Sequence, residues 1–131
     1  MPHVNWLAVL AAAVSSFVLG GIWYSALFAK AWQAAAGLSD EQIAGGDKRL
    51  IFGGGFVLSL IASAVFALFL GPNPALMLGF GAGFAAGLCW VTTSFGINYL
   101  FERRSLKLFL INGGYHTLQF TLIGVILGLW H

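Results

Sequence analysis

Polar side chains that could take part in chemistry collect in one stretch of this chain, residues 90–119, whereas most other positions are Ala, Leu, Gly or Phe. The side chains in question are Thr92, Thr93, Ser94, Asn98, Asn112, His116 and Gln119. The last three follow i, i+4, i+7 spacing, so a helix would carry them on one face. His116 is the only acidic or basic side chain well inside an apolar segment, and such a residue is by default a functional-site hypothesis.

Two interpretations stay open for His116. In the first, a neutral imidazole is hydrogen-bonded to a Thr or Ser of a neighbouring helix and only supports packing. In the second, the imidazole responds to protons or contacts a ligand in a small cavity. Neither supports catalysis, because no acidic residue lies in an apolar segment to orient the ring. We therefore predict no catalytic residues and no enzyme.

Metal and cofactor chemistry is poorly supported by the remaining residues. His3 and His131 lie at the two chain ends, which we expect far from His116, and two exposed histidines make a poor metal site. Cys89 is the single cysteine, so neither a disulfide nor a Cys-based metal site forms within one chain. Most of the glycines lie inside apolar segments and form no phosphate-binding loop. We predict neither a metal nor a cofactor.

The composition sets the class of protein. Of 131 residues, 60% are hydrophobic and 8% charged, and the mean hydropathy is +0.91. Soluble domains carry about 25% charged residues. We therefore expect an all-α integral membrane protein forming one domain over residues 1–131. The net charge of +2 comes from basic residues in two short loops, which form no extended patch for a nucleic acid.

Four apolar segments are long enough to cross a bilayer core of about 30 Å. They cover residues 4–29, 50–71, 75–101 and 108–130. A cleavable signal peptide is the alternative for the first, but the N-terminus lacks Lys and Arg and the segment is too long. The polar loop 30–49 contains a capping-box pattern, Ser39 with Gln42, which predicts a short helix ended by Gly45-Gly46.

All basic residues fall on one side of these four spans. They are Lys30, Lys48, Arg49, Arg103, Arg104 and Lys107. The positive-inside rule places both charged loops in the cytoplasm and both termini outside. Trp6 and Trp130 would mark the outer interface, and Trp23 and Trp32 the inner one.

Small residues recur every four positions in each span, which is typical of close helix packing in lipid. Those we expect at helix contacts include Ser16, Gly20, Gly55, Ser59, Ser63, Gly79, Gly83 and Gly87. They predict a compact four-helix bundle. The same faces would fit a second copy, so we also expect a homo-oligomer.

Two short segments recur in the same order along the chain. The sequence GIWY at 21–24 echoes GINY at 96–99, and LIFGG at 50–54 echoes LINGG at 110–114. The matches are consistent with two parallel hairpins related by a pseudo-two-fold axis, or with chance in a biased composition. Asn98 and Asn112 each lie five residues from the basic turn, so we expect them at equal depth and within hydrogen-bonding reach.

The segments GGIWYSALFAKAW (20–32) and INGGYHTLQFTLIGVILGLW (111–130) resemble a bacterial membrane family known as domain of unknown function 1761. The likeness extends over nearly the whole chain, from the Asn near its start to the His-bearing last span closed by Trp. The resemblance implies a small four-helix membrane protein and brings no activity or catalytic residues.

Two functional hypotheses follow. The first is a binding or permeation module for a small neutral or weakly charged solute, centred on Asn98, Asn112, His116 and Gln119 with Thr92 and Thr93 beside them. The second is a structural or accessory membrane protein whose polar residues only fix helix packing. Membrane lipids and further copies of the chain are the expected partners, and a small ligand is expected under the first hypothesis alone.

Overall fold

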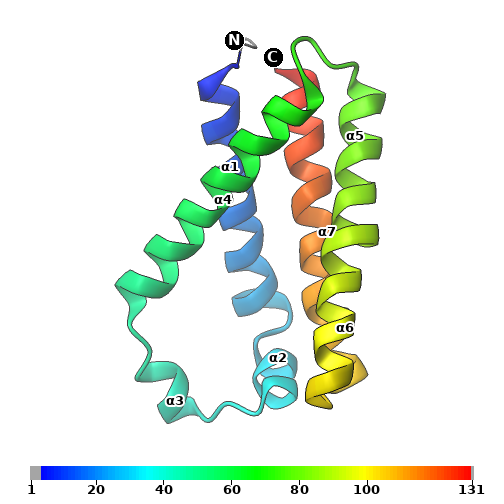
Figure 1. The fold of residues 1–131 in the computed structure, drawn as a ribbon. Helices are drawn as coiled ribbons and strands as arrows, with labels where there is room; N and C mark the ends of the chain where they lie inside the picture. The colour runs from blue at the N-terminus through cyan, green and yellow to red at the C-terminus, as the bar shows by residue number, and fades with distance from the viewer. Residues whose placement is uncertain (1–3, 131) are drawn as a thin grey trace.

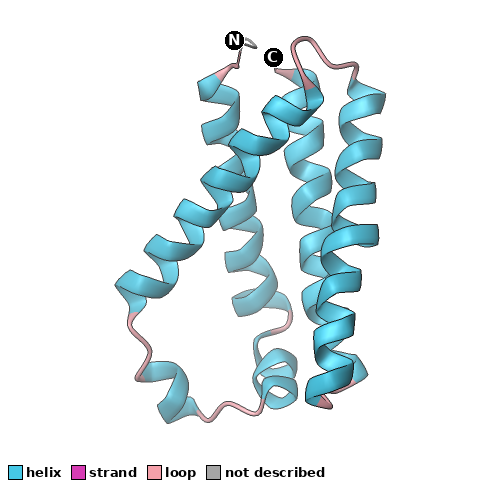
Figure 2. Ribbon diagram, in the orientation of Figure 1, coloured by secondary structure: helices cyan, strands magenta, loops and turns pink. Residues whose placement is uncertain are grey.

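The computed structural model describes residues 4–130, and that part of the chain consists of helices and loops (Figure 2). Four helical stretches are long and apolar enough to cross a membrane, as predicted: Trp6–Leu27, Lys48–Leu70, Leu76–Glu102 and Leu106–Leu129. Their bounds differ from the predicted ones by no more than two residues. Each of the first three stretches runs antiparallel to the one that follows it along the chain (Figure 1).

Two of these stretches contain a π-helical segment. The first consists of α1 (Trp6–Gly21) followed by the π-helix η1 (Ile22–Leu27). The third consists of α5 (Leu76–Ala85), the π-helix η2 (Ala86–Thr92) and α6 (Thr93–Glu102). A π-helical turn has i→i+5 hydrogen bonds and often occurs at functional sites. Each one changes the direction in which the following side chains point.

The polar loop is more ordered than the sequence predicts. It holds α2 (Ala29–Ala36), which ends at Gly37 with a φ of 73°, and then α3 (Asp40–Ala44). The predicted capping box is present, because Ser39 Oγ accepts from the Gln42 amide at 3.1 Å and Gln42 Oε1 accepts from the Ser39 amide at 2.8 Å. Arg104 Nη1 donates to the Ala36 carbonyl at 3.2 Å, which ties this loop to the basic turn.

α4 (Lys48–Leu70) and α7 (Leu106–Leu129) are each started by a side-chain cap. Asp47 Oδ1 accepts from the amides of Arg49 and Leu50, and Ser105 Oγ accepts from that of Leu108. These bonds satisfy amides that have no partner within the helix.

α7 packs closely against α5 and η2. A Cβ added at Gly83 would meet the Phe120 carbonyl, and one added at Gly124 would meet the Gly79 carbonyl. At Gly87 an added Cβ would lie 2.7 Å from the His116 carbonyl oxygen. Gly79, Gly83 and Gly87, which the four-residue spacing predicts at a helix contact, thus lie where the backbones of the two helical stretches approach closely.

α4 packs differently, because only the half near Leu70 is buried. Ser59, Ser63 and Phe66 are its buried residues, and α4 contacts α1 and α7. Its Lys48 half diverges from the other helices (Figure 1), and no atom lies within 4 Å of a Cβ added at Gly55. The packing role predicted for Gly55 is thus not met within the chain. The compact bundle and the pseudo-two-fold relation stay predictions.

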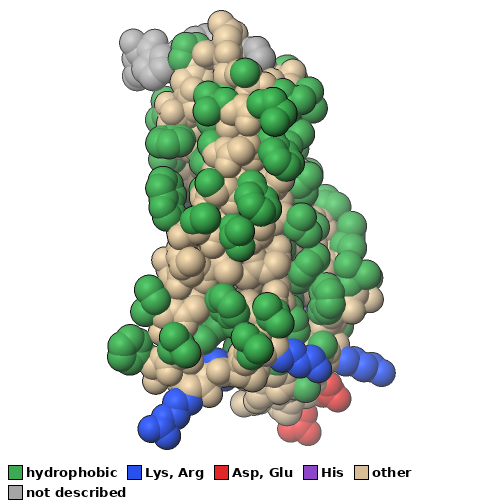
Figure 3. All heavy atoms as spheres, turned by 90° about the vertical axis from the view of Figure 1, so that its right-hand side faces the viewer, with side chains coloured by type: hydrophobic (Ala, Val, Ile, Leu, Met, Phe, Trp, Pro, Cys, Tyr) green, Lys and Arg blue, Asp and Glu red, His purple; other side chains and the backbone are tan. Residues whose placement is uncertain are grey.

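Charged side chains gather at one end of the molecule (Figure 3), which we call the basic end: α2, α3, the start of α4, and the turn between α6 and α7. The flank in that view is covered mainly by hydrophobic side chains. The six Lys and Arg residues therefore lie together in space as well as in the predicted loops.

Candidate functional site

Thr92 and Thr93 lie at the end of η2, and their hydroxyl groups donate hydrogen bonds to backbone carbonyls. Thr92 Oγ1 donates to one oxygen at a time and lies 2.7 Å from the Gly87 carbonyl, 3.0 Å from the Gly113 carbonyl and 3.1 Å from Thr117 Oγ1. Thr93 Oγ1 lies 2.7 Å from the Cys89 carbonyl. A π-helical turn frees carbonyls from their usual α-helical partners, and nearby hydroxyls can replace those bonds. Thr92 is buried and Thr93 exposed, so only Thr92 reaches a neighbouring helix.

Asn112 joins three parts of the chain. Tyr24 Oη donates to Asn112 Oδ1 at 2.6 Å, and Asn112 Nδ2 donates to Tyr99 Oη at 2.7 Å. We call this set the Tyr–Asn–Tyr link. It connects η1, α7 and α6, and a hydrogen bond between helices in lipid contributes about 0.6–2 kcal/mol.

The predicted pairing of Asn98 with Asn112 is wrong. Asn98 is exposed, and Asn112 bonds to Tyr24 and Tyr99 instead. The two asparagines were matched by depth alone, which does not specify the direction of a side chain around its helix. In the structure it is the neighbouring Tyr99 that points at Asn112.

His116 pairs with Gln119 on its own helix. His116 Nδ1 lies 2.9 Å from Gln119 Oε1, and Gln119 is 7% exposed. The predicted Thr or Ser partner on another helix is therefore replaced by a residue one turn away. In the neutral tautomer with the hydrogen on Nδ1, this nitrogen donates to Oε1, and Nε2 is then a free acceptor. Neither His116 Nε2 nor Gln119 Nε2 has a hydrogen-bond partner in residues 4–130.

Aromatic rings from four segments surround this polar group. The His116 ring stacks on Phe95 with centroids 4.8 Å apart and an interplanar angle of 14°. We call the whole set the aromatic cluster, and its ring contacts run in the order Trp32, Tyr24, Tyr115, His116, Phe95 and Tyr99. Hydrogen bonds through Asn112 link Tyr24 back to Tyr99, so the cluster closes on itself.

The sequence patterns did not predict this cluster. One available signal was that the repeated segments place Tyr24 and Tyr99 in corresponding positions. A second contact ties the cluster to α1, where Tyr115 Oη donates to the Ser16 carbonyl at 3.0 Å.

The serines predicted at helix contacts are buried where α1 meets α4. Ser16 and Ser63 are each 0% exposed, and Ser59 is 9% exposed. The hydroxyl oxygens of Ser16 and Ser63 have no hydrogen-bond partner within residues 4–130. Gly20 also lies at a contact, because a Cβ added there would lie 3.3 Å from Tyr115 Oη. These residues occupy the interior as expected.

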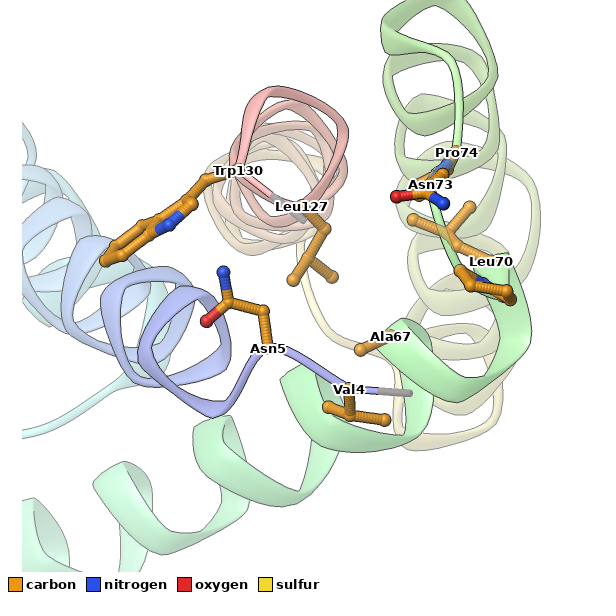
Figure 4. A pocket seen from close by; sticks show the side chains of 10 residues that line it. Val4, Asn5, Ala67, Leu70, Asn73, Pro74, Leu127 and Trp130 are labelled. Carbon is orange, nitrogen blue, oxygen red and sulfur yellow. The ribbon is translucent and has the colours of Figure 1, made fainter. Parts of the chain in front are cut away.

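Two hollows lie away from His116. One of about 20 Å³ lies at the end opposite the basic end, among Asn5, Leu70, Asn73, Leu127 and Trp130 (Figure 4). That volume holds about one water molecule. The other is a groove of about 320 Å³ on the outer face of η2 and α6, lined by Trp90, Val91, Ser94, Phe95 and Asn98.

Residues 4–130 contain no group of three or more His, Cys, Asp or Glu side chains suited to a metal ion. His3 and His131, which were considered at the sequence level, lie outside the described residues.

Comparison with known proteins gives one match. The model of a family described as "Protein of unknown function (DUF1761)" matches residues 7–128. No curated protein and no solved structure matches the chain. The match thus covers the four long helical stretches except their end residues Trp6 and Leu129, and it includes the whole aromatic cluster.

Proposed function

We propose a function on the premise that this chain belongs to the DUF1761 family of proteins of unknown function, whose model it matches over residues 7–128. The chain acts as a multi-pass membrane protein that binds a small neutral or weakly charged solute beside His116 and Gln119. The basic end faces the cytoplasm of a bacterial inner membrane, because all six Lys and Arg residues lie there.

One observation carries the binding proposal. The hydrogen bond between His116 Nδ1 and Gln119 Oε1 leaves an acceptor, His116 Nε2, and a donor, Gln119 Nε2, without partners in the described chain. The buried unpaired side-chain atoms of the described residues are Ser16 Oγ and Ser63 Oγ, so His116 Nε2 and Gln119 Nε2 can be reached from outside the chain. Where such an atom faces hydrocarbon, leaving it unpaired costs several kcal/mol. A solute with one donor and one acceptor would satisfy both atoms, and the absence of an acidic side chain beside them favours a neutral one.

A structural role is the second candidate, and a different observation favours it. Thr92, Thr117 and Asn112 form their hydrogen bonds within the chain itself. Three of these bonds join different helices: Thr92 to the Gly113 carbonyl, Thr92 to Thr117, and Asn112 to Tyr99. Under this alternative, the His116–Gln119 pair is one more packing contact and no solute binds.

Permeation is an extension of the first candidate and requires more than one copy. The Lys48 half of α4 diverges from α1, so one chain does not enclose a path along its own axis with four helices (Figure 1). In a homo-oligomer, helices of a second copy would complete the enclosure of such a path. We keep transport and oligomerisation as proposals that depend on solute binding.

The test compares two site variants with one control. His116→Leu and Gln119→Leu remove the free acceptor and donor, while Asn98→Leu changes an exposed amide outside the pair. Native mass spectrometry of protein released from its membrane reports copy number and any non-lipid adduct. An adduct present in the parent and in Asn98→Leu, but lost in both site variants, supports binding.

The structural alternative predicts a different result. The parent then carries only lipid, and His116→Leu lowers the unfolding temperature without removing an adduct. That outcome overturns the binding proposal. If an adduct is found, solute flux into vesicles containing the protein decides between binding alone and permeation.

A further inference from the structure

The groove on η2 and α6 lies on a surface that a membrane would cover with lipid. Trp90 is 66% exposed, and Ser94 and Asn98 beside it are exposed as well. With a volume of about 320 Å³, the groove is far larger than a water site and its lining is mainly apolar. Its five lining residues follow one another along a single helical stretch, and an apolar face of this kind suits an acyl chain.

Asn98 is an unusual residue for such a surface. Its side-chain amide has no hydrogen-bond partner in the described chain, whereas the Ser94 hydroxyl donates to the Trp90 carbonyl at 2.6 Å. An unpaired carboxamide is costly wherever lipid, and not water, covers it. A ligand that carries a hydrogen-bond acceptor at this level would remove that cost.

The depth of Asn98 in the membrane indicates which part of a lipid molecule lies beside it and accepts its hydrogen bond. Asn98 lies four residues before the helix end at Glu102, which corresponds to about 6 Å at 1.5 Å per residue. The headgroup layer between the bilayer surface and the hydrocarbon core is about 5–8 Å thick. With the turn after Glu102 at the surface, Asn98 reaches the level where the headgroup layer ends and the acyl esters begin.

The turn beyond Asn98 adds a charge preference. It carries Arg103, Arg104 and Lys107 against the single acid Glu102, and no ion pair joins these charges within residues 4–130. Arg104 uses one donor on the Ala36 carbonyl and keeps its positive charge. A basic cluster at the membrane surface attracts anionic lipid headgroups.

We propose that the outer face of η2 and α6 binds one anionic diacyl phospholipid. Its phosphate lies at the basic turn, an ester carbonyl accepts a hydrogen bond from Asn98 Nδ2, and an acyl chain lies in the groove against Trp90. The inference rests on the proposed membrane insertion and is independent of solute binding at His116.

The test uses Trp90 as a reporter of its own groove. The protein is placed in phosphatidylcholine vesicles that contain a small fraction of phosphatidylglycerol with brominated acyl chains, which quench nearby tryptophan. Subtracting the signal of Trp90→Phe isolates Trp90 from the other four tryptophans. A second series replaces the ester-linked lipid with its ether-linked analogue, which lacks the carbonyl groups.

The expected result is a preference for the ester-linked over the ether-linked lipid of about two- to tenfold, which is the effect of one hydrogen bond. Asn98→Leu should be quenched equally by the ester-linked and the ether-linked lipid. Thr93→Val is the control and should keep the preference, because the Thr93 hydroxyl bonds only backbone carbonyls of its own helix. Ser94→Phe fills the groove and lowers quenching by every brominated lipid.

Two results overturn the proposal. The first is equal quenching by ester and ether lipids in the parent protein. The second is efficient disulfide cross-linking through the exposed Cys89, next to Trp90, at low protein density, because a second copy would then occupy the face. A solute adduct that depends on His116 would change neither result, so the two proposals can fail separately.

Discussion

Tyr24 donates a 2.6 Å hydrogen bond to the side-chain oxygen of Asn112, which lies 88 positions later in the chain. The same amide donates to Tyr99, so one asparagine fixes η1 and α6 at once. Since α1 and α6 both pack on α7, the Tyr–Asn–Tyr link sets the spacing of three helices near the basic end. Its contribution to stability is directly measurable.

We expect Asn112→Leu to lower the free energy of unfolding by about 1–3 kcal/mol, because two tyrosine hydroxyls lose their partner. Tyr24→Phe and Tyr99→Phe each remove one bond and should cost less. Unfolding in mixed micelles measures all three, and double-mutant cycles give the coupling. Asn98→Leu is the control, with an expected change near zero. An equal loss in Asn98→Leu would contradict the assignment of Asn112 as the linking residue.

Alanine substitution should separate packed glycines from open ones. Gly83→Ala places a methyl group against the Phe120 carbonyl, so we expect a loss of about 1–3 kcal/mol from overpacking. Gly55→Ala meets no atom within 4 Å, and the better helix propensity of Ala should add about 0.5–1 kcal/mol. Thermal unfolding of the two variants measures the difference. A large loss at Gly55 would instead show a contact that one chain does not supply.

The Thr92 hydroxyl should matter more than the Thr92 methyl group. Thr92→Val keeps the shape but removes the hydroxyl near the Gly87 and Gly113 carbonyls, and we expect a loss of about 1–2 kcal/mol. Thr92→Ser keeps the hydroxyl and should lose less. Unfolding curves of both variants test the order. If Thr92→Ser is the less stable protein, packing of the methyl group against Gly113 dominates.

Membrane orientation can be tested with two single-cysteine proteins in a Cys89→Ala background. Pro72→Cys lies in the loop between α4 and α5, and Glu41→Cys lies in α3 at the basic end; both positions are exposed. With the basic end in the cytoplasm, a membrane-impermeant maleimide labels Pro72→Cys in intact cells and Glu41→Cys only after permeabilisation. The reverse labelling pattern would refute the orientation, and labelling of both in intact cells would indicate two orientations.

The long helices were predictable because length and hydropathy determine them directly. Glycines at 79, 83 and 87 were also predictable as contacts, since four-residue spacing puts them on one helix face. The same rule was not met at Gly55, where α4 diverges from its neighbours within the chain. Small residues at four-residue spacing identify a helix face that can pack closely, but they do not identify the helix that packs against it.

The site was harder to predict than the fold. The depth of Asn112 followed from its distance to the basic turn, but its partners depend on directions around three helices. The π-helices η1 and η2 change those directions, and no residue pattern had indicated them. Thus His116, Gln119 and Asn112 were found from their spacing, while the bonds of Asn112 to Tyr24 and Tyr99 required the structure.

Each π-helical turn also has a consequence for chain length. Such a turn holds one residue more than the hydrogen-bonded loop of an α-helix, so it takes up one extra residue locally and keeps the following helix in register. If the same number of residues between Ala86 and Thr92 were wound as an α-helix, all of α6 would be rotated by about 100°. Tyr99 would then turn away from Asn112, and the groove beside Trp90 would lose Asn98. The surface that α6 presents is therefore determined by residue number as much as by residue type.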